Sequence, residues 1–169
     1  RAPIDVRAYP EQVDDLIGFL ADSLPADHPF NGLRAGPKTE GVPEVWLLGS
    51  GIDSAQLAAQ RGLPFSFAHF FGQADKGPAI VEYYRRHFRP SKECAEAKVH
   101  IAVQVMCADT QQEAEWHASS LRLGRIQMAR NEKREGIVSP EEASRHAFTS
   151  EELRFLEQSG MRGTTGDAA

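Results

Sequence analysis

The segment of residues 43–71, PEVWLLGSGIDSAQLAAQRGLPFSFAHFF, constrains the fold more than any other part of the chain. Residues 44–48 form a short, nearly continuous apolar run, which is typical of a strand buried on both faces. A glycine turn at residues 49–51 follows, then a short helix at residues 54–61, and then an aromatic strand at residues 65–71. This order of elements predicts a βαβ unit and therefore an α/β fold.

The turn between the first strand and the helix predicts anion binding. We expect Asp53 or Ser54 to cap the helix, and Gly62 stands where a helix C-cap belongs. Free backbone N–H groups at the start of a helix, with the hydroxyls of Ser50 and Ser54, make a site for a phosphate group. The alternative is a tight strand-to-helix corner with no ligand, because short Gly/Ser turns are common. The spacing matches neither the dinucleotide-binding nor the P-loop pattern.

Composition and charge exclude several classes of function. The 169 residues are 41% hydrophobic and 25% charged, with a net charge of −5, and they predict a single domain over residues 1–169. The acidic balance disfavours nucleic acid and anionic membrane as partners. No apolar run approaches the ~18 residues of a membrane span and no signal peptide is visible, so we expect a cytoplasmic protein. Cys94 and Cys107 have no metal or redox spacing, so no metal site and no disulfide are predicted.

The rest of the chain alternates between helical patterns and one clear strand. Periodicity and capping residues predict helices at residues 10–21, 78–88, 110–128 and 149–158, and a further helix start at Ser139. The aperiodic residues from Ser23 to Pro43 are expected to form a loop.

Residues 99–107 form the clearest strand of the sequence. One face is expected to lie under helices and comprises Val99, Ile101, Val103, Val105 and Cys107. The other face is expected to fill the interior of a barrel and comprises His100, Ala102, Gln104 and Met106.

One histidine is a candidate for chemistry. His69 lies near the end of the second strand, where the catalytic or cofactor-contacting groups of barrel enzymes sit. A general acid or base is one interpretation, and a hydrogen-bonded histidine of the core or rim is the other. Cys107 has no histidine and carboxylate placed to activate it. The acidic pairs at 141–142 and 151–152 are expected to be helix N-terminal charges.

The segment around the turn resembles the bacterial luciferase-like, flavin-dependent monooxygenases. Members of that family carry a strand ending in Gly-Ser-Ser, a following Ser or Thr, an Ala-Ala helix, Gly-Leu-Pro and an aromatic strand. The corresponding pieces here are residues 48–51, Ser54 and residues 58–61, 62–64 and 65–70. Further likeness follows at residues 99–120 and in the Ser139-Pro140-Glu141-Glu142-Ala143 run, so the resemblance covers nearly the whole chain.

The resemblance implies a (β/α)8 TIM barrel of the bacterial luciferase type, present here as an incomplete C-terminal part. A complete barrel needs roughly 250 residues, and only three strands are clear in the sequence. The family's final strand and helix are expected to be absent, and residues 163–169 to begin a helix. Residues are also expected to be missing between Pro3 and Ile4 and after Ala169.

The resemblance also implies the cofactor and its ligands. In the family the turn holds the 5′-phosphate of reduced FMN, so Gly49, Ser50, Gly51 and Ser54 correspond to the phosphate cradle. Arg1 corresponds to an arginine that contacts the same phosphate. One departure is Gly51, which stands where the family usually has a second serine, so one hydroxyl contact is lost.

The implied activity is flavin-dependent monooxygenation. Reduced FMN from a separate flavin reductase would react with O2 to oxidise a small organic substrate, and a homodimer is expected by analogy. The catalytic groups would lie in the absent first half. Three alternatives stay open: a deazaflavin-dependent oxidoreductase of the same fold, a non-catalytic flavin-binding subunit, and a binding domain for a nucleotide sugar or another phosphate ligand.

Overall fold

The computed structural model describes residues 6–37, 40–71, 74–133, 136–158 and 164–167. Arg1 and the Pro3–Ile4 junction, for which a phosphate contact and a gap are predicted, lie outside the described residues. The helices and strands are η1 (Val6–Ala8), α1 (Tyr9–Leu20), β1 (Leu47–Gly49), α2 (Ile52–Arg61), β2 (Phe65–Ala68), η2 (Ala74–Lys76), α3 (Gly77–His87), β3 (Val99–Ala102), β4 (Val105–Ala108), α4 (Gln111–Ala129), α5 (Pro140–Ala143), α6 (Ser150–Gln158) and β5 (Thr164–Asp167).

A parallel sheet in the order β1-β2-β3 organises the first part of the chain. Leu47 pairs with Phe65, and Phe65 in turn pairs with Val99. The predicted βαβ unit is therefore confirmed, although both of its strands are shorter than expected. Because all three strands are parallel, their carboxyl ends meet at one edge of the sheet.

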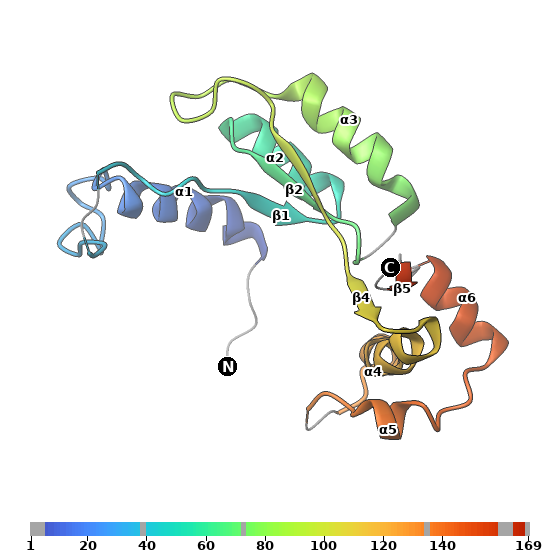
Figure 1. The fold of residues 1–169 in the computed structure, drawn as a ribbon. Coiled ribbons are helices and arrows are strands. Elements are labelled where there is room, and N and C mark those ends of the chain that lie inside the picture. Colours follow the sequence, from blue (N-terminus) through green and yellow to red (C-terminus); the bar gives the residue numbers. More distant parts are fainter. Residues whose placement is uncertain (1–5, 38–39, 72–73, 134–135, 159–163, 168–169) are drawn as a thin grey trace.

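Helices α2 and α3 cover one face of this sheet (Figure 1). Phe65, Phe67 and Tyr84 are the largest side chains that are fully buried there. Around them pack alanines of α2 and Ile80 of α3, and Val13 of α1 joins the same cluster. The small alanine side chains let α2 approach the sheet closely, so the helix buries its apolar face as the sequence predicts.

The opposite face of the sheet is open. Leu48 is 53% exposed, so the prediction that its strand is buried on both faces is wrong. Alternation places Leu48, Ser66 and His100 on this face. The indole of Trp46 stacks on the His100 imidazole with ring centroids 3.8 Å apart. The described helices lie against the other face of the sheet, and they therefore leave Leu48 uncovered.

The predicted strand at residues 99–107 is two strands. β3 ends at Ala102, β4 begins at Val105, and β4 pairs with β5 in a separate two-stranded parallel sheet. Figure 1 shows the chain crossing from the first part of the molecule to the second through this link. β5 shows that residues 164–167 are a strand, which corrects the expectation that a helix begins there and that no further strand follows.

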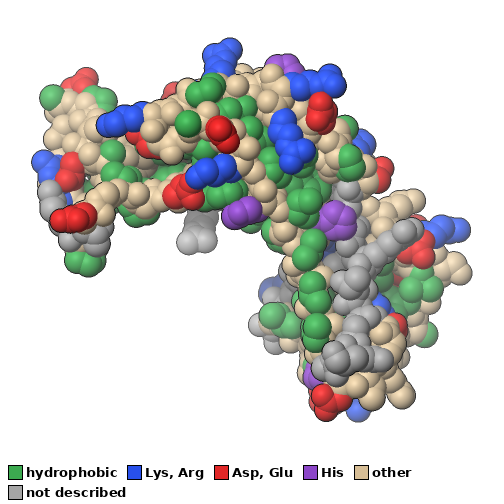
Figure 2. All heavy atoms as spheres, turned by 45° about the horizontal axis from the view of Figure 1, so that its top comes forward, with side chains coloured by type: hydrophobic (Ala, Val, Ile, Leu, Met, Phe, Trp, Pro, Cys, Tyr) green, Lys and Arg blue, Asp and Glu red, His purple; other side chains and the backbone are tan. Residues whose placement is uncertain are grey.

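The apolar side chains of this bent strand are not covered by helices. Ile101, Val103 and Val105 are all more than half exposed, so the prediction for that face is wrong. Gln104 is exposed as well and does not fill an interior. Figure 2 shows hydrophobic side chains on the narrow part of the molecule between its two ends. Burial here is set by the elements packed on the strand, which its own pattern does not encode.

The caps of α4, α5 and α6 agree with the sequence. Thr110 accepts a hydrogen bond from the backbone N–H of Glu113, and Ser139 accepts one from that of Glu142. Thr149 caps α6 in the same way. Cys94 and Cys107 are free thiols, as predicted. Of the helices in the described ranges, none is both long and apolar enough to cross a bilayer.

Candidate functional site

The predicted phosphate turn lies at the carboxyl edge of the three-stranded sheet. β1 ends at Gly49, Ser50 follows, and α2 starts at Ile52 with Gly51 as its N-cap. The helix thus begins two residues earlier than expected, and neither Asp53 nor Ser54 is its cap. Gly51 has an extended backbone and no side chain, so no side-chain oxygen occupies the first N–H groups of α2.

Gly49 is held against Ser54. A Cβ atom added at Gly49 would collide with both the Cβ and the hydroxyl oxygen of Ser54. The Ser54 side chain therefore folds back over the end of β1. A Cβ added at Gly51 would meet no atom within 4 Å. The turn is tight on one side and open on the other, which leaves room for a group in front of the helix terminus.

The polar atoms of the turn are available for a ligand. Ser50 and Ser54 are half-buried, and their hydroxyls make no hydrogen bond within the described part of the chain. The hydroxyls of Ser50 and Ser54 and the first amides of α2 thus belong to one short segment at the carboxyl edge of the sheet. Asp53 is exposed in the first turn of α2 and places a negative charge beside them. This donor set fits a phosphate group.

His69 comes directly after β2, at the same edge of the sheet. Its backbone N–H donates to the Ala102 carbonyl at 3.0 Å, which fixes the chain where β2 ends beside β3. The imidazole is half-buried and meets the Phe67 ring edge-on, with centroids 6.4 Å apart. Within the described ranges no carboxylate or hydroxyl bonds to it. His69 therefore borders the turn's edge of the sheet without a partner that would identify it as an acid or base.

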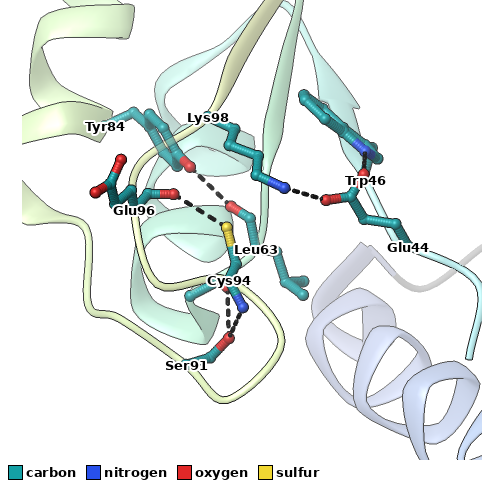
Figure 3. Close-up of polar contacts among 9 residues, drawn as sticks. Glu44, Trp46, Leu63, Tyr84, Ser91, Cys94, Glu96 and Lys98 are labelled. Atoms are coloured by element: carbon teal, nitrogen blue, oxygen red, sulfur yellow. Dashed lines mark hydrogen bonds and ion pairs between the residues drawn. The ribbon is translucent and has the colours of Figure 1, made fainter. Parts of the chain in front are cut away.

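The opposite, amino-terminal edge of the sheet carries a polar network (Figure 3) and a pocket beside it. Lys98 donates to Glu44 at 2.6 Å, and Glu44 also accepts a hydrogen bond from the Trp46 indole at 2.8 Å. The Lys98 hydrogen bond is the main reason that the pKa of Glu44 is lowered. Tyr84 donates to the Leu63 carbonyl at 3.0 Å, and burial raises the pKa of its phenol to about 12.

A pocket of about 460 Å³ lies beside this network and is bordered by Glu44, Arg61 and Cys94. Arg61 forms a bidentate pair with Asp14 of α1. Glu44 and Arg61, two of the charged residues that line the pocket, are thus each paired with an oppositely charged residue outside its lining. In barrels this end of the strands stabilises the fold, whereas the carboxyl end carries chemistry.

A further cavity, on α4, was not anticipated from the sequence. It measures about 220 Å³ and includes Ser120 and Arg125 among its lining residues. The sequence signal was a serine and an arginine beside the apolar positions of a long amphipathic helix. Such a signal cannot be interpreted without knowing what packs on that helix.

Comparison with known proteins identifies the family. The model of the family described as luciferase-like monooxygenase matches residues 23–167, which include the turn, His69 and α4. The chain belongs to this family. The resemblance noted from the residues around the turn is thereby confirmed.

Several relatives of this luciferase-like chain cover most of its length. It is 34% identical to the Bacillus subtilis protein YceB over 158 residues, which are 94% of the chain and 47% of that relative. It is 30% identical to the luciferase-like monooxygenase of Escherichia coli K12 over 168 residues, 98% of the chain and 48% of the relative. It is 34% identical to the Bacillus subtilis N-acetyl-S-alkylcysteine monooxygenase over 116 residues, 68% of the chain and 34% of the relative.

A solved structure has a similar fold. The crystal structure of apo-MsnO8 aligns with a TM-score of 0.61 at 26% identity, covering 78% of the chain and 38% of that structure. The fold is thus the luciferase-like one, with mixed helices and strands. The chain spans about half the length of YceB and of the Escherichia coli relative, both of which align with most of the chain.

Proposed function

We propose that the chain is the phosphate-binding part of a flavin-dependent monooxygenase that uses reduced FMN and O2 to oxidise a small organic substrate. The family generally uses a reduced flavin, either FMN or the deazaflavin F420. Membership in the luciferase-like monooxygenases supports the reaction class. The name of the N-acetyl-S-alkylcysteine monooxygenase supports a small organic substrate.

The turn after β1 is the observation that carries this proposal. Ser50 and Ser54 would donate their hydroxyls to the FMN phosphate, and the amides at the start of α2 would add backbone donors. Gly49 lets Ser54 lie close to β1, and Gly51 leaves space for the phosphate oxygens. The flavin supplies the oxygen chemistry when it is bound. The residues of this chain position the phosphate and hold the edge of the sheet beside it.

The parallel order of the strands supports a larger architecture. β1, β2 and the bent pair β3/β4 follow one another as neighbours, and β5 pairs parallel to β4. Four successive parallel strands connected through helices suit one half of a (β/α)8 barrel. In such a barrel the open face with Leu48 and His100 would point to the interior. The flavin reductase and a homodimer remain predictions.

Anaerobic titration with reduced FMN tests the proposal directly. Ser50→Ala combined with Ser54→Ala should weaken binding about tenfold or more, because two hydroxyl contacts to a charged phosphate are lost. Gln56→Ala is the matched control, since Gln56 is exposed on α2 away from the turn. An equal loss in the control, or no binding of reduced FMN by the folded chain, would contradict the assignment. Binding of reduced F420 in place of FMN would select the deazaflavin alternative.

A further inference from the structure

The cavity on α4 lies away from the turn and has its own donor set. Helix α4, the link between β3 and β4, and the segment before α5 border this open cavity, contributing Arg125, Gln104 and Ile137 among others. Gly124 lies one helical turn after Ser120 and carries no side chain, so the space between the helix and the link stays open.

Arg125 is a partly buried cation without an anion. Its guanidinium lies over the Phe71 ring, 4.4 Å from the centroid, which holds the group through a cation–π contact. Within the described residues no carboxylate pairs with it, whereas Arg61, Arg122 and Arg130 each have one. Burial lowers the pKa of Arg125, as expected for a charge that has lost part of its hydration.

Ser120 is a buried hydroxyl without a partner. The residue is 8% exposed, and its oxygen has no hydrogen-bond partner among the residues that the structure describes. Its neighbour Ser119 is equally buried, but it donates to the Trp116 carbonyl at 2.5 Å. Buried polar atoms that lack a partner in a protein usually meet a water molecule or a ligand. Because Ser120 lines the cavity, a ligand oxygen there would satisfy it.

The remaining walls set the size and polarity of the ligand. Apart from the polar groups, the cavity is bordered by the apolar side chains Leu121, Met128, Ile137 and Val138, and it is open to solvent where Met128 and Ile137 are exposed. A space of about 220 Å³ has the volume of about seven water molecules in the liquid. This matches a carboxylate on a short aliphatic body better than a nucleotide or a flavin.

We propose that this cavity is a binding site for a small aliphatic carboxylate, separate from the flavin turn. Arg125 binds the carboxylate through charge-assisted hydrogen bonds, and Ser120 donates its hydroxyl to one carboxylate oxygen. The aliphatic body packs against Leu121 and Met128. The Gln104 amide closes the polar side of the cavity.

Titration with butyrate, followed by ¹H–¹⁵N NMR and thermal unfolding of the full chain, tests this site. Butyrate should shift amide signals of residues 120–128 and 136–138 saturably and should raise the melting temperature. Arg125→Met should weaken butyrate binding about tenfold or more. Arg125→Lys, which keeps the charge and the contact with Phe71, should lose part of the affinity. Arg122→Met is the control on the same helix.

The two adjacent serines separate a ligand role from a structural one. Ser120→Ala should leave the melting temperature of the free chain unchanged or higher, because an unsatisfied buried hydroxyl is removed, while it weakens butyrate binding. Ser119→Ala should lower the melting temperature and leave butyrate binding unchanged.

Three outcomes would overturn the proposal. One is the absence of saturable butyrate binding up to tens of millimolar, and another is butyrate binding that Arg125→Met does not weaken. The third is inorganic phosphate binding as tightly as butyrate, because the apolar walls would then contribute nothing to recognition of the aliphatic body. Reduced FMN binding is unaffected in all of these variants if the two sites are separate.

Discussion

Gly49 and Gly51, which lie on either side of Ser50 in the turn, differ in whether the structure requires a glycine. At Gly49 any side chain would strike Ser54, so the close approach of the helix to the strand requires glycine. At Gly51 the backbone is extended and the space is free, so a larger residue is tolerated. The sequence shows both as parts of one Gly-Ser-Gly run. Only the packing around the turn separates a required glycine from a replaceable one.

Gly51→Ser should strengthen phosphate binding at the turn. The substitution restores the hydroxyl that the family usually has, at a position where the structure has room for it. One additional hydrogen bond to a charged group is worth about 1.5 kcal/mol or more, so reduced FMN should bind roughly tenfold tighter. Gly49→Ser is the opposite control and should weaken binding by displacing Ser54. A Gly51→Ser variant that binds more weakly than the parent chain would show that the phosphate lies elsewhere.

Gly62→Ala should destabilise the chain. Gly62 ends α2 in the left-handed region at φ 62°, and an added Cβ would lie 2.7 Å from the Ser91 Cβ and would collide with the Arg89 carbonyl. The backbone strain alone costs about 1–2 kcal/mol, and the collision adds to it. Gly41→Ala isolates the strain, because Gly41 has φ 89° with no atom near its Cβ position. In urea unfolding, Gly62→Ala should lower the free energy of unfolding more than Gly41→Ala does. An equal decrease would show that the loop containing Arg89 and Ser91 moves away without loss of stability.

At the scale of elements, a single phenol connects α3 to the chain entering β2. Tyr84 is fully buried and bonds to the Leu63 carbonyl. The unfolded chain releases a tyrosine proton near pH 10, whereas burial raises the pKa of Tyr84 to about 12. The neutral phenol therefore stabilises the fold fully below about pH 10, and this stability is lost as the pH rises through about 12.

Tyr84→Phe should remove this alkaline loss and lower stability at neutral pH. The lost hydrogen bond leaves a buried carbonyl, which costs roughly 1–2 kcal/mol. Unfolding free energies between pH 7 and pH 12 measure both effects. Tyr83→Phe is the control, since Tyr83 is half-buried on the same helix and stacks on His87. An unchanged alkaline slope in Tyr84→Phe would assign the loss to another group.

A buried carboxylate connects α4 and α6 in a similar way. Glu152 is 4% exposed, pairs with Arg130 at 3.0 Å and contacts His146 at 3.2 Å. The backbone N–H of Thr149 contributes most to lowering the pKa of Glu152. The ionised form therefore stabilises the fold above the usual carboxyl pKa, and this stability is lost as the pH falls through the lowered value.

Glu152→Gln should make the free energy of unfolding less dependent on pH in the acid range. The amide keeps the size of the side chain but does not titrate, so unfolding free energy should fall less between pH 5 and pH 3 than in the parent chain. Glu157→Gln, on the exposed side of α6, is the matched control. If the free energy of unfolding falls equally with pH in parent and variant, Glu152 is not the group responsible for the loss.

At the scale of the molecule, the large side chains are buried unevenly. The core of α1, α2, α3 and the first sheet contains Phe65, Phe67 and Tyr84. The buried apolar residues of the second part are fewer and smaller, such as Ala114, Leu123 and Leu156. The two parts meet through the link between β3 and β4, where apolar side chains are exposed. Local stability is expected to follow this difference.

Amide hydrogen exchange should show this difference directly. The amides of β2, α2 and α3 should exchange most slowly, and those of α5 and α6 should exchange faster by at least an order of magnitude. Phe67→Ala, which opens the first core, should cost about 3–5 kcal/mol and accelerate exchange there. Uniform protection along the chain would show instead that both parts unfold as one unit.

The sequence by itself determined the elements that depend on neighbours a few residues apart. The Gly-Ser-Gly corner, the helix caps at Thr110, Ser139 and Thr149, and the glycine at the end of α2 all follow from local backbone rules. The same local pattern carried the family resemblance, which the family match confirmed.

The tertiary structure decided which faces are covered and which polar groups meet. The bend that divides residues 99–107, the exposure of Leu48 and the strand at Thr164–Asp167 depend on pairing between distant segments. Arg125 meets Phe71 through packing between segments more than fifty residues apart. Within the described residues the Ser120 hydroxyl lacks a partner beside the cavity between α4 and the β3–β4 link. Periodicity tells which side of an element is apolar. Only the arrival of other elements determines whether that side is buried, and what remains unsatisfied within it.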